Sequence, residues 1–89
     1  MRAAYSLLYA DNIELRDAQL KGIYANKEAA IRALHTELML ACSEYDIQPP
    51  YRFRFTELPE DRISVDFGSW SHFIGLTGVT MADLDMAGA

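Results

Sequence analysis

Apolar and polar residues alternate along much of this chain with the period of two that is typical of β-strands. Residues 3–10 alternate weakly and are apolar on both faces, which predicts a central or well covered strand. Residues 19–24 predict a second strand. For this strand an earlier start at Ile13 is the alternative, with Asp17 marking a bulge.

The clearest strand pattern lies in residues 51–57 and 62–67, which flank a polar turn containing Pro59. Each segment has apolar residues on one face and polar residues on the other. Because a slip of one residue would expose a whole aromatic row, matching the apolar faces predicts the register. The match sets Arg54 opposite Asp66 as a cross-strand ion pair. On the apolar face it pairs Phe55 with Val65 and Phe53 with Phe67.

The hydrophobic period changes to that of a helix at Asn26, which is a preferred N-cap residue. Glu28 lies in the first turn, where the helix dipole favours an acid. Apolar residues then recur at spacings of three and four, which predicts an amphipathic helix of about five turns. Pro49 and Pro50 end it. Its apolar stripe consists of Ile31, Leu34, Leu38, Ala41 and Tyr45, with Cys42 beside it.

The C-terminal third of the chain predicts a tight turn at Gly68-Ser69 and a returning fifth strand. In this strand Trp70, His72, Ile74 and Leu76 share the inner face, and a short helix beginning near Ser69 is the competing interpretation. Thr80 and Asp83 form a capping pattern, so residues 79–89 predict a short helical turn or a frayed tail.

Together these elements predict an α+β fold in one domain that spans residues 1–89. It contains an antiparallel β-sheet of four to five strands in the order β-β-α-β-β, with the fifth strand last. One amphipathic helix packs on one face of the sheet.

The net charge of −5 narrows the classes of partner, because nucleic-acid binding requires clustered basic residues and no Lys or Arg follows Arg62. A basic protein surface suits this chain better than DNA or an anionic membrane. The apolar runs are far too short to span a bilayer. Cys42 is the single cysteine, which indicates a buried free thiol in a reducing compartment and a cytoplasmic location.

Catalytic and metal-binding chemistry find little support in the pattern. In the strand interpretation Asp66 and Ser71 share the outer face while His72 points inward, so these three side chains diverge and form no catalytic triad. His35 and Cys42 lie on one helical flank but lack the spacing of a zinc site. The acid pairs Glu60-Asp61 and Asp83-Asp85 are interpreted as solvated carboxylates. The sequence therefore predicts no enzyme, cofactor or metal.

Exposed apolar side chains are the features that indicate a binding role. Leu40 falls opposite the apolar stripe of the helix, and Trp70 lies at the tip of the predicted hairpin, where it either anchors a partner or closes one end of the core. Acidic residues provide electrostatic steering toward a basic partner. These are Glu57, Glu60 and Asp61, joined by Asp11, Glu14 and Asp17.

The passage QLKGIYANKEAAIRAL, residues 19–34, resembles a pattern of many small phage and mobile-element proteins. In that pattern a strand ends in a Gly-hydrophobic-aromatic sequence, and a Lys-Glu-Ala helix follows. The resemblance implies a setting in which small acidic proteins inhibit host defence. Anti-CRISPR proteins are examples, and they block basic nucleic-acid channels or protein surfaces.

The leading hypothesis is a non-enzymatic inhibitor or adaptor that occupies a basic surface of a partner protein, such as a host nucleic-acid-binding effector, without touching nucleic acid directly. One alternative is a small ligand-binding or enzymatic domain with a pocket near His72. The other is a homo-oligomeric structural protein joined through an exposed sheet edge or through the face that carries Leu40.

Overall fold

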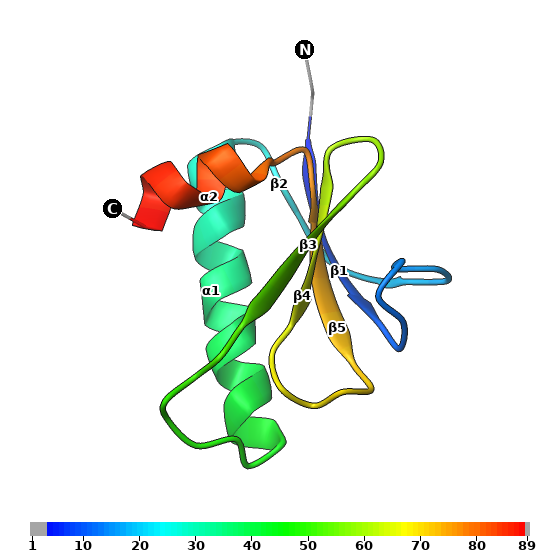
Figure 1. Ribbon diagram of the computed structural model, residues 1–89. Helices are drawn as coiled ribbons and strands as arrows, with labels where there is room; N and C mark the ends of the chain where they lie inside the picture. The colour runs from blue at the N-terminus through cyan, green and yellow to red at the C-terminus, as the bar shows by residue number, and fades with distance from the viewer. Residues whose placement is uncertain (1–3, 89) are drawn as a thin grey trace.

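The computed structural model describes residues 4–88 and the side chains of residues 4–84. It confirms the α+β class and resolves the number of strands as five. Every strand pair is antiparallel, and the spatial order is β2-β1-β5-β4-β3 (Figure 1). The elements are β1 (Tyr5–Ala10), β2 (Gln19–Tyr24), α1 (Lys27–Glu44), β3 (Arg54–Leu58), β4 (Arg62–Asp66), β5 (Phe73–Thr77) and α2 (Met81–Gly88).

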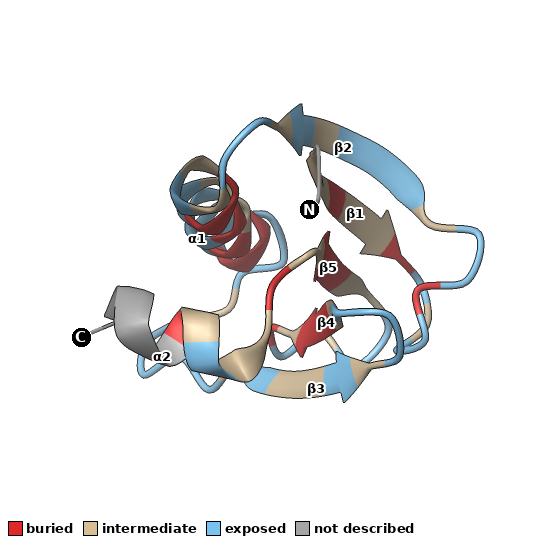
Figure 2. Cartoon of the chain, turned by 90° about the horizontal axis from the view of Figure 1, so that it is seen from above, coloured by how far each residue is buried: buried red, intermediate tan, exposed pale blue. Residues whose placement is uncertain are grey.

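Helix α1 packs on one face of the sheet, against β1, β2 and β5, and the core lies between them (Figure 2). The predicted N-cap is confirmed, because the side chain of Asn26 accepts the Ala29 backbone N–H at 2.8 Å. Tyr45 was predicted in the buried stripe, but it forms the C-cap and is 37% exposed. The buried residues of α1 are Ala30, Ile31, Leu34, Leu38, Ala41 and Cys42.

The β3–β4 hairpin has the predicted register, with Arg54 opposite Asp66 and Phe55 opposite Val65. Strand β3 begins at Arg54, however, rather than at residue 51. Strand β4 ends at Asp66, whose carboxylate accepts the N–H of Gly68 as the chain turns away at a φ of 112°. The residues before Arg54 therefore have no strand to pair with.

The start and the bulge of β2 also differ from the prediction. Leu15 and Asp17 have φ angles of 61° and 54°, which interrupt an extended backbone, so β2 begins at Gln19 and not at Ile13. The register shifts where Leu7 faces Gly22 and Leu8 faces Leu20, which places the bulge at Lys21.

The chain after β5 is helical rather than frayed. Thr80 and Asp83 form the predicted reciprocal cap, in which the Thr80 N–H donates to the Asp83 carboxylate at 2.9 Å and the Asp83 N–H donates to the Thr80 hydroxyl at 3.3 Å. Asp83 also pairs with Lys27 of α1 at 3.2 Å. The Thr80 N–H, and after it Lys27, holds the pKa of Asp83 below its ordinary value. The side chain of Asp85 and residue 89 lie outside the described residues.

On the outer face of the sheet, a buried hydroxyl has no hydrogen-bond partner among the described residues. Ser64 of β4 is 1% exposed, and its hydroxyl makes no hydrogen bond. Its neighbours across the sheet are Thr56 and Gly75, and the side chain of Leu15 folds back over Gly75. Burying an unsatisfied hydroxyl costs about 1 to 3 kcal/mol.

We therefore expect Ser64→Ala to stabilise the protein by about 1 kcal/mol, because it removes the unpaired hydroxyl and leaves the backbone pairing intact. Urea unfolding measures the change, and Ser6→Ala is the matched control, because Ser6 lies on the same face of the sheet in β1, two strands away, and is partly exposed. A loss of stability in Ser64→Ala alone would contradict the expectation.

Candidate functional site

The loop between β4 and β5, residues 67–72, is held by its own side chains. The hydroxyl of Ser69 accepts the backbone N–H groups of Ser71 at 3.4 Å and His72 at 2.9 Å, and donates to the His72 carbonyl at 3.1 Å. Asp66 accepts the Gly68 N–H at 2.9 Å. The predicted two-residue turn at Gly68-Ser69 is thus a longer loop, and β5 begins only at Phe73.

Trp70 projects from this loop with 74% of its surface exposed. Its backbone has a φ of 69°, which breaks the strand alternation that was predicted to turn its indole toward the core. The prediction of an inner-face Trp70 was therefore wrong, whereas those for Ile74 and Leu76 are confirmed, because both are buried. The indole belongs to the surface of the protein.

The guanidinium of Arg54 lies over the Trp70 ring, 5.3 Å from its centroid. Such a cation–π contact restrains the indole while leaving its other face open. The predicted ion pair of Arg54 with Asp66 does not form, even though the two residues are register partners, because Asp66 caps the loop instead. Two strands and the loop together position Trp70.

Aromatic rings from β1 and from the end of α1 pack against the rings of the loop. The ring of His72 stacks on Tyr9 of β1 at a centroid distance of 5.6 Å and lies 5.1 Å from Tyr45 at the end of α1. The hydroxyls of Tyr9 and Tyr45 are 2.6 Å apart. Tyr45 also packs against Phe67 at 5.5 Å. His72 is thus partly buried, and its ring stacks on Tyr9, which packs against the core.

Ser71 and His72 meet, contrary to the predicted divergence: the Ser71 hydroxyl lies 2.9 Å from Nδ1 of His72. Asp66 is the acid that could complete a triad in the sequence, but its carboxylate accepts a hydrogen bond from the Gly68 N–H. A serine nucleophile requires a base that a third group orients. These contacts order the loop and do not align the three side chains for acyl transfer.

The phenol of Tyr9, beneath the loop, is held in its neutral form. Burial, followed by the hydrogen bond and charge of Tyr45, raises the pKa of Tyr9 well above its ordinary value. The ammonium of Lys21 lies 5.7 Å from the centre of the Tyr9 ring. At neutral pH this phenol is a hydrogen-bonding group and not a general base.

The flank of α1 is hollowed in the described part of the chain. A hollow of about 190 Å³ lies between α1 and β3, and a second, of about 270 Å³, lies along the first half of α1. His35 lines both, and His72 contributes to neither. The lining of the first is otherwise apolar and consists of Leu38, Met39, Phe53 and Phe55.

Cys42 and His35, considered above as metal ligands, lie in different surroundings. Cys42 is fully buried, with its thiol 4.0 Å from the Phe67 carbonyl, and burial raises the pKa of that thiol. His35 is exposed. Within residues 4–84 no group of three or more His, Cys, Asp or Glu side chains is arranged to hold a metal ion.

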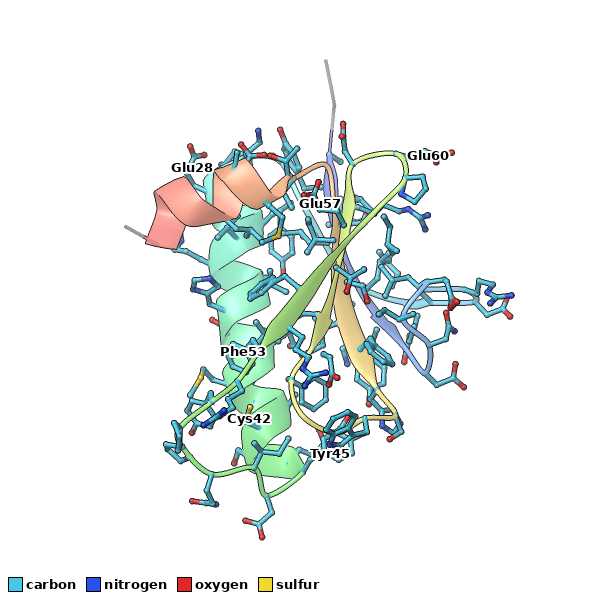
Figure 3. The ribbon with its side chains drawn as sticks, viewed as in Figure 1. Glu28, Cys42, Tyr45, Phe53, Glu57 and Glu60 are labelled. Atoms are coloured by element: carbon cyan, nitrogen blue, oxygen red, sulfur yellow. The ribbon has the colours of Figure 1, made fainter. Side chains whose placement is uncertain are left out.

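The predicted acidic residues divide between the two ends of the sheet. The loop after β1, which carries Asp11, Glu14 and Asp17, begins beside the first residue of β5 and so shares an end with the Trp70 loop. The other acids, Glu57, Glu60 and Asp61, lie at and before the β3–β4 turn at the opposite end. Figure 3 shows Glu57 and Glu60 at the end of the sheet away from Tyr45, which packs beneath the Trp70 loop.

Leu40, the other predicted anchor, is 57% exposed on α1, and its neighbour Met39 is 46% exposed. The rings of Tyr9 and Tyr45, which support the Trp70 loop, were not identified from the sequence. The two residues lie 36 positions apart in different elements, so no spacing rule links them.

Comparisons with protein-family models, with curated proteins and with solved structures find no match to this chain. The class of the protein therefore rests on the structure alone. It is a small α+β domain with a five-stranded antiparallel sheet, one main helix and a surface loop that exposes an indole. Among the described residues, no helix has both the length and the apolar character needed to cross a membrane.

Proposed function

We propose that the protein is a non-enzymatic binding protein that inhibits or adapts a partner, and that Trp70 is its anchor. The 74% exposure of Trp70 carries the proposal. Exposing an apolar indole to water is unfavourable, and Trp is a frequent hot-spot residue in protein interfaces. The Ser69 hydrogen bonds and the Arg54 contact order the indole before binding, which lowers the entropy cost of association.

A basic protein surface suits the charges around this anchor. Asp11 and Asp17 are exposed at the same end of the sheet as Trp70, and Glu14 is tied to Arg16 at 3.3 Å. These acids supply short-range complementarity to a basic rim, while Glu60 and Asp61 at the far end add long-range steering. The resemblance to small phage proteins favours one class of partner, a nucleic-acid-binding effector. In this proposal the protein blocks the basic channel of that effector.

We expect Trp70→Ala to weaken partner association at least about tenfold while changing folding stability by less than about 0.5 kcal/mol, because the indole is an anchor and makes few buried contacts. Affinity capture from a nuclease-treated cell lysate, quantified protein by protein, compares the variant with the wild type. Leu20→Ala, which trims a side chain 54% exposed on β2, is the control.

Two further variants separate the parts of the proposal. Leu40→Ala tests the apolar spot on α1, and the pair Glu60→Lys with Asp61→Lys tests steering through the salt dependence of association. If the captured partner is retained by Trp70→Ala as well as by the wild type, Trp70 is not the anchor. If neither salt nor the lysine pair changes association, the electrostatic part fails.

A further inference from the structure

A row of side-chain positions crosses the outer face of the sheet, the face opposite α1 (Figure 2). Residues directly opposite each other in an antiparallel pair point to the same side, so register partners from strand to strand share this face. From β2 to β3 the row consists of Leu20, Leu8, Gly75, Ser64 and Thr56. Since Gly75 has no side chain, the row contains a notch between Leu8 and Ser64.

Leu15 of the β1–β2 loop, residues 11–18, occupies this notch. An ideal Cβ on Gly75 would overlap the methyl carbons of Leu15, which is 5% exposed. Leu15 has a φ of 61°, a conformation that side chains of its kind rarely adopt. The loop is ordered from within, because the Asn12 carbonyl accepts the Leu15 N–H and the Asn12 side chain bonds the N–H and the carbonyl of Arg16. Leu15 is its buried side chain and docks it on the sheet.

The notch contains a polar group that Leu15 leaves without a partner. The hydroxyl of Ser64 is 1% exposed and makes no hydrogen bond within residues 4–84. The Cβ atoms of opposite residues in an antiparallel pair are about 5 Å apart, so Ser64 borders the space that the methyl groups of Leu15 fill over Gly75. An isobutyl group cannot pair with a hydroxyl, and leaving a buried hydroxyl unpaired is unfavourable. Leu15 therefore complements the apolar side of the notch and leaves its polar side unsatisfied.

We propose that the notch at Gly75 binds a small ligand in which a branched aliphatic group lies next to an amide, and that Leu15 occupies the site when no ligand is bound. The isobutyl group of Leu15 defines the apolar part of the ligand, and the unpaired Ser64 hydroxyl defines the polar part. Such a mainly apolar site with one well placed polar group is typical of small-molecule sites. The β1–β2 loop lifts from the sheet as the ligand enters. This inference is independent of the role proposed for Trp70.

N-acetyl-leucinamide is the probe, titrated into the wild-type protein and followed by the amide NMR signals. Saturable shifts at Gly75 and Ser64 are expected, together with faster hydrogen exchange at Leu15 and Arg16 as the loop lifts. Leu15→Ala vacates the notch and is expected to bind the probe at least about tenfold more tightly, because no side chain has to be displaced. N-acetyl-glycinamide, which lacks the isobutyl group, is the control ligand and is expected to cause none of these changes.

Ser64→Ala distinguishes recognition of the ligand from the filling of an apolar hole. In the wild type and in Leu15→Ala it is expected to weaken binding of the probe by about fivefold, because the hydroxyl that pairs with the amide is lost. Ser6→Ala, on the same face and partly exposed, is the matched control and is expected to leave the affinity unchanged.

Equal affinity with and without the Ser64 hydroxyl would overturn the proposal. So would the absence of saturable shifts at Gly75 in the wild type and in Leu15→Ala. If Leu15→Ala does not fold, the wild type and Ser64→Ala decide the question between them, because Ser64→Ala retains the backbone pairing of β4.

Discussion

Phe67→Ala is expected to destabilise the protein by about 3 to 5 kcal/mol, a large part of the roughly 5 to 15 kcal/mol that holds a small domain folded. Phe67 is 1% exposed and is the largest fully buried side chain. Its ring packs against Tyr45, and its carbonyl faces the Cys42 thiol. Removing it leaves a cavity where α1, β4 and the Trp70 loop meet, and a tightly packed core collapses only partly into such a space.

Equilibrium unfolding in urea measures this loss, and Phe53→Ala is the matched control. Phe53 is the same residue type, is only partly buried and lines the hollow between α1 and β3, so we expect its loss to cost about half as much. An equal cost for the two variants would show that the core does not centre on Phe67. Near-UV circular dichroism of Trp70 reports whether the loop loses its order in Phe67→Ala.

The features that the sequence predicted well are those determined by neighbours within a few residues or within one hairpin. The Asn26 cap and the Thr80–Asp83 cap each join residues three positions apart. The pairing of Phe55 with Val65 follows from two alternating segments joined by a short turn. In these cases burial, periodicity and capping all favour the same local structure.

The Trp70 loop was predicted less well, because its conformation depends on backbone angles and side-chain hydrogen bonds that a periodic pattern of apolar residues does not encode. Gly68 and Trp70 both adopt positive φ, and the hydroxyl of Ser69 bonds to three backbone groups across the turn. Short Ser and Asp side chains compete with the strand ladder for backbone hydrogen bonds. The alternation of residues 70–76 therefore extended the predicted strand three residues too far toward Trp70.

The division of the acidic residues is a consequence of topology rather than of composition. Strand β5 lies between β1 and β4, so the β1–β2 loop and the β3–β4 turn lie at opposite ends of the sheet. A net charge is a property of the whole chain and contains no information about this arrangement. The binding face that we propose at Trp70 therefore includes Asp11 and Asp17 and excludes Glu60.

Gly75→Val is expected to destabilise the protein by about 2 to 3 kcal/mol, although valine favours strands. Gly75 lies in the middle of β5, between Leu8 and Ser64, and its missing side chain leaves the space that Leu15 fills. A Cβ at Gly75 would approach Cδ2 of Leu15 to 2.9 Å, closer than real Cβ contacts allow. Leu15 is 5% exposed, so its displacement loses most of the burial energy of a leucine and undocks the loop.

A double-mutant cycle isolates this contact from other effects of the valine. Leu15→Ala alone removes the burial energy of the leucine. In the double variant the alanine also relieves the clash with the introduced valine, so we expect the loss of stability to be smaller than the sum of the two single losses by at least about 1 kcal/mol. Urea unfolding gives the free energies, and amide hydrogen exchange of residues 11–18 reports undocking. Strict additivity would mean that valine acts through β5 alone. A measured coupling would instead show that the space above Gly75 holds the β1–β2 loop, residues 11–18, beside Trp70, since Leu15 is the buried side chain of that loop.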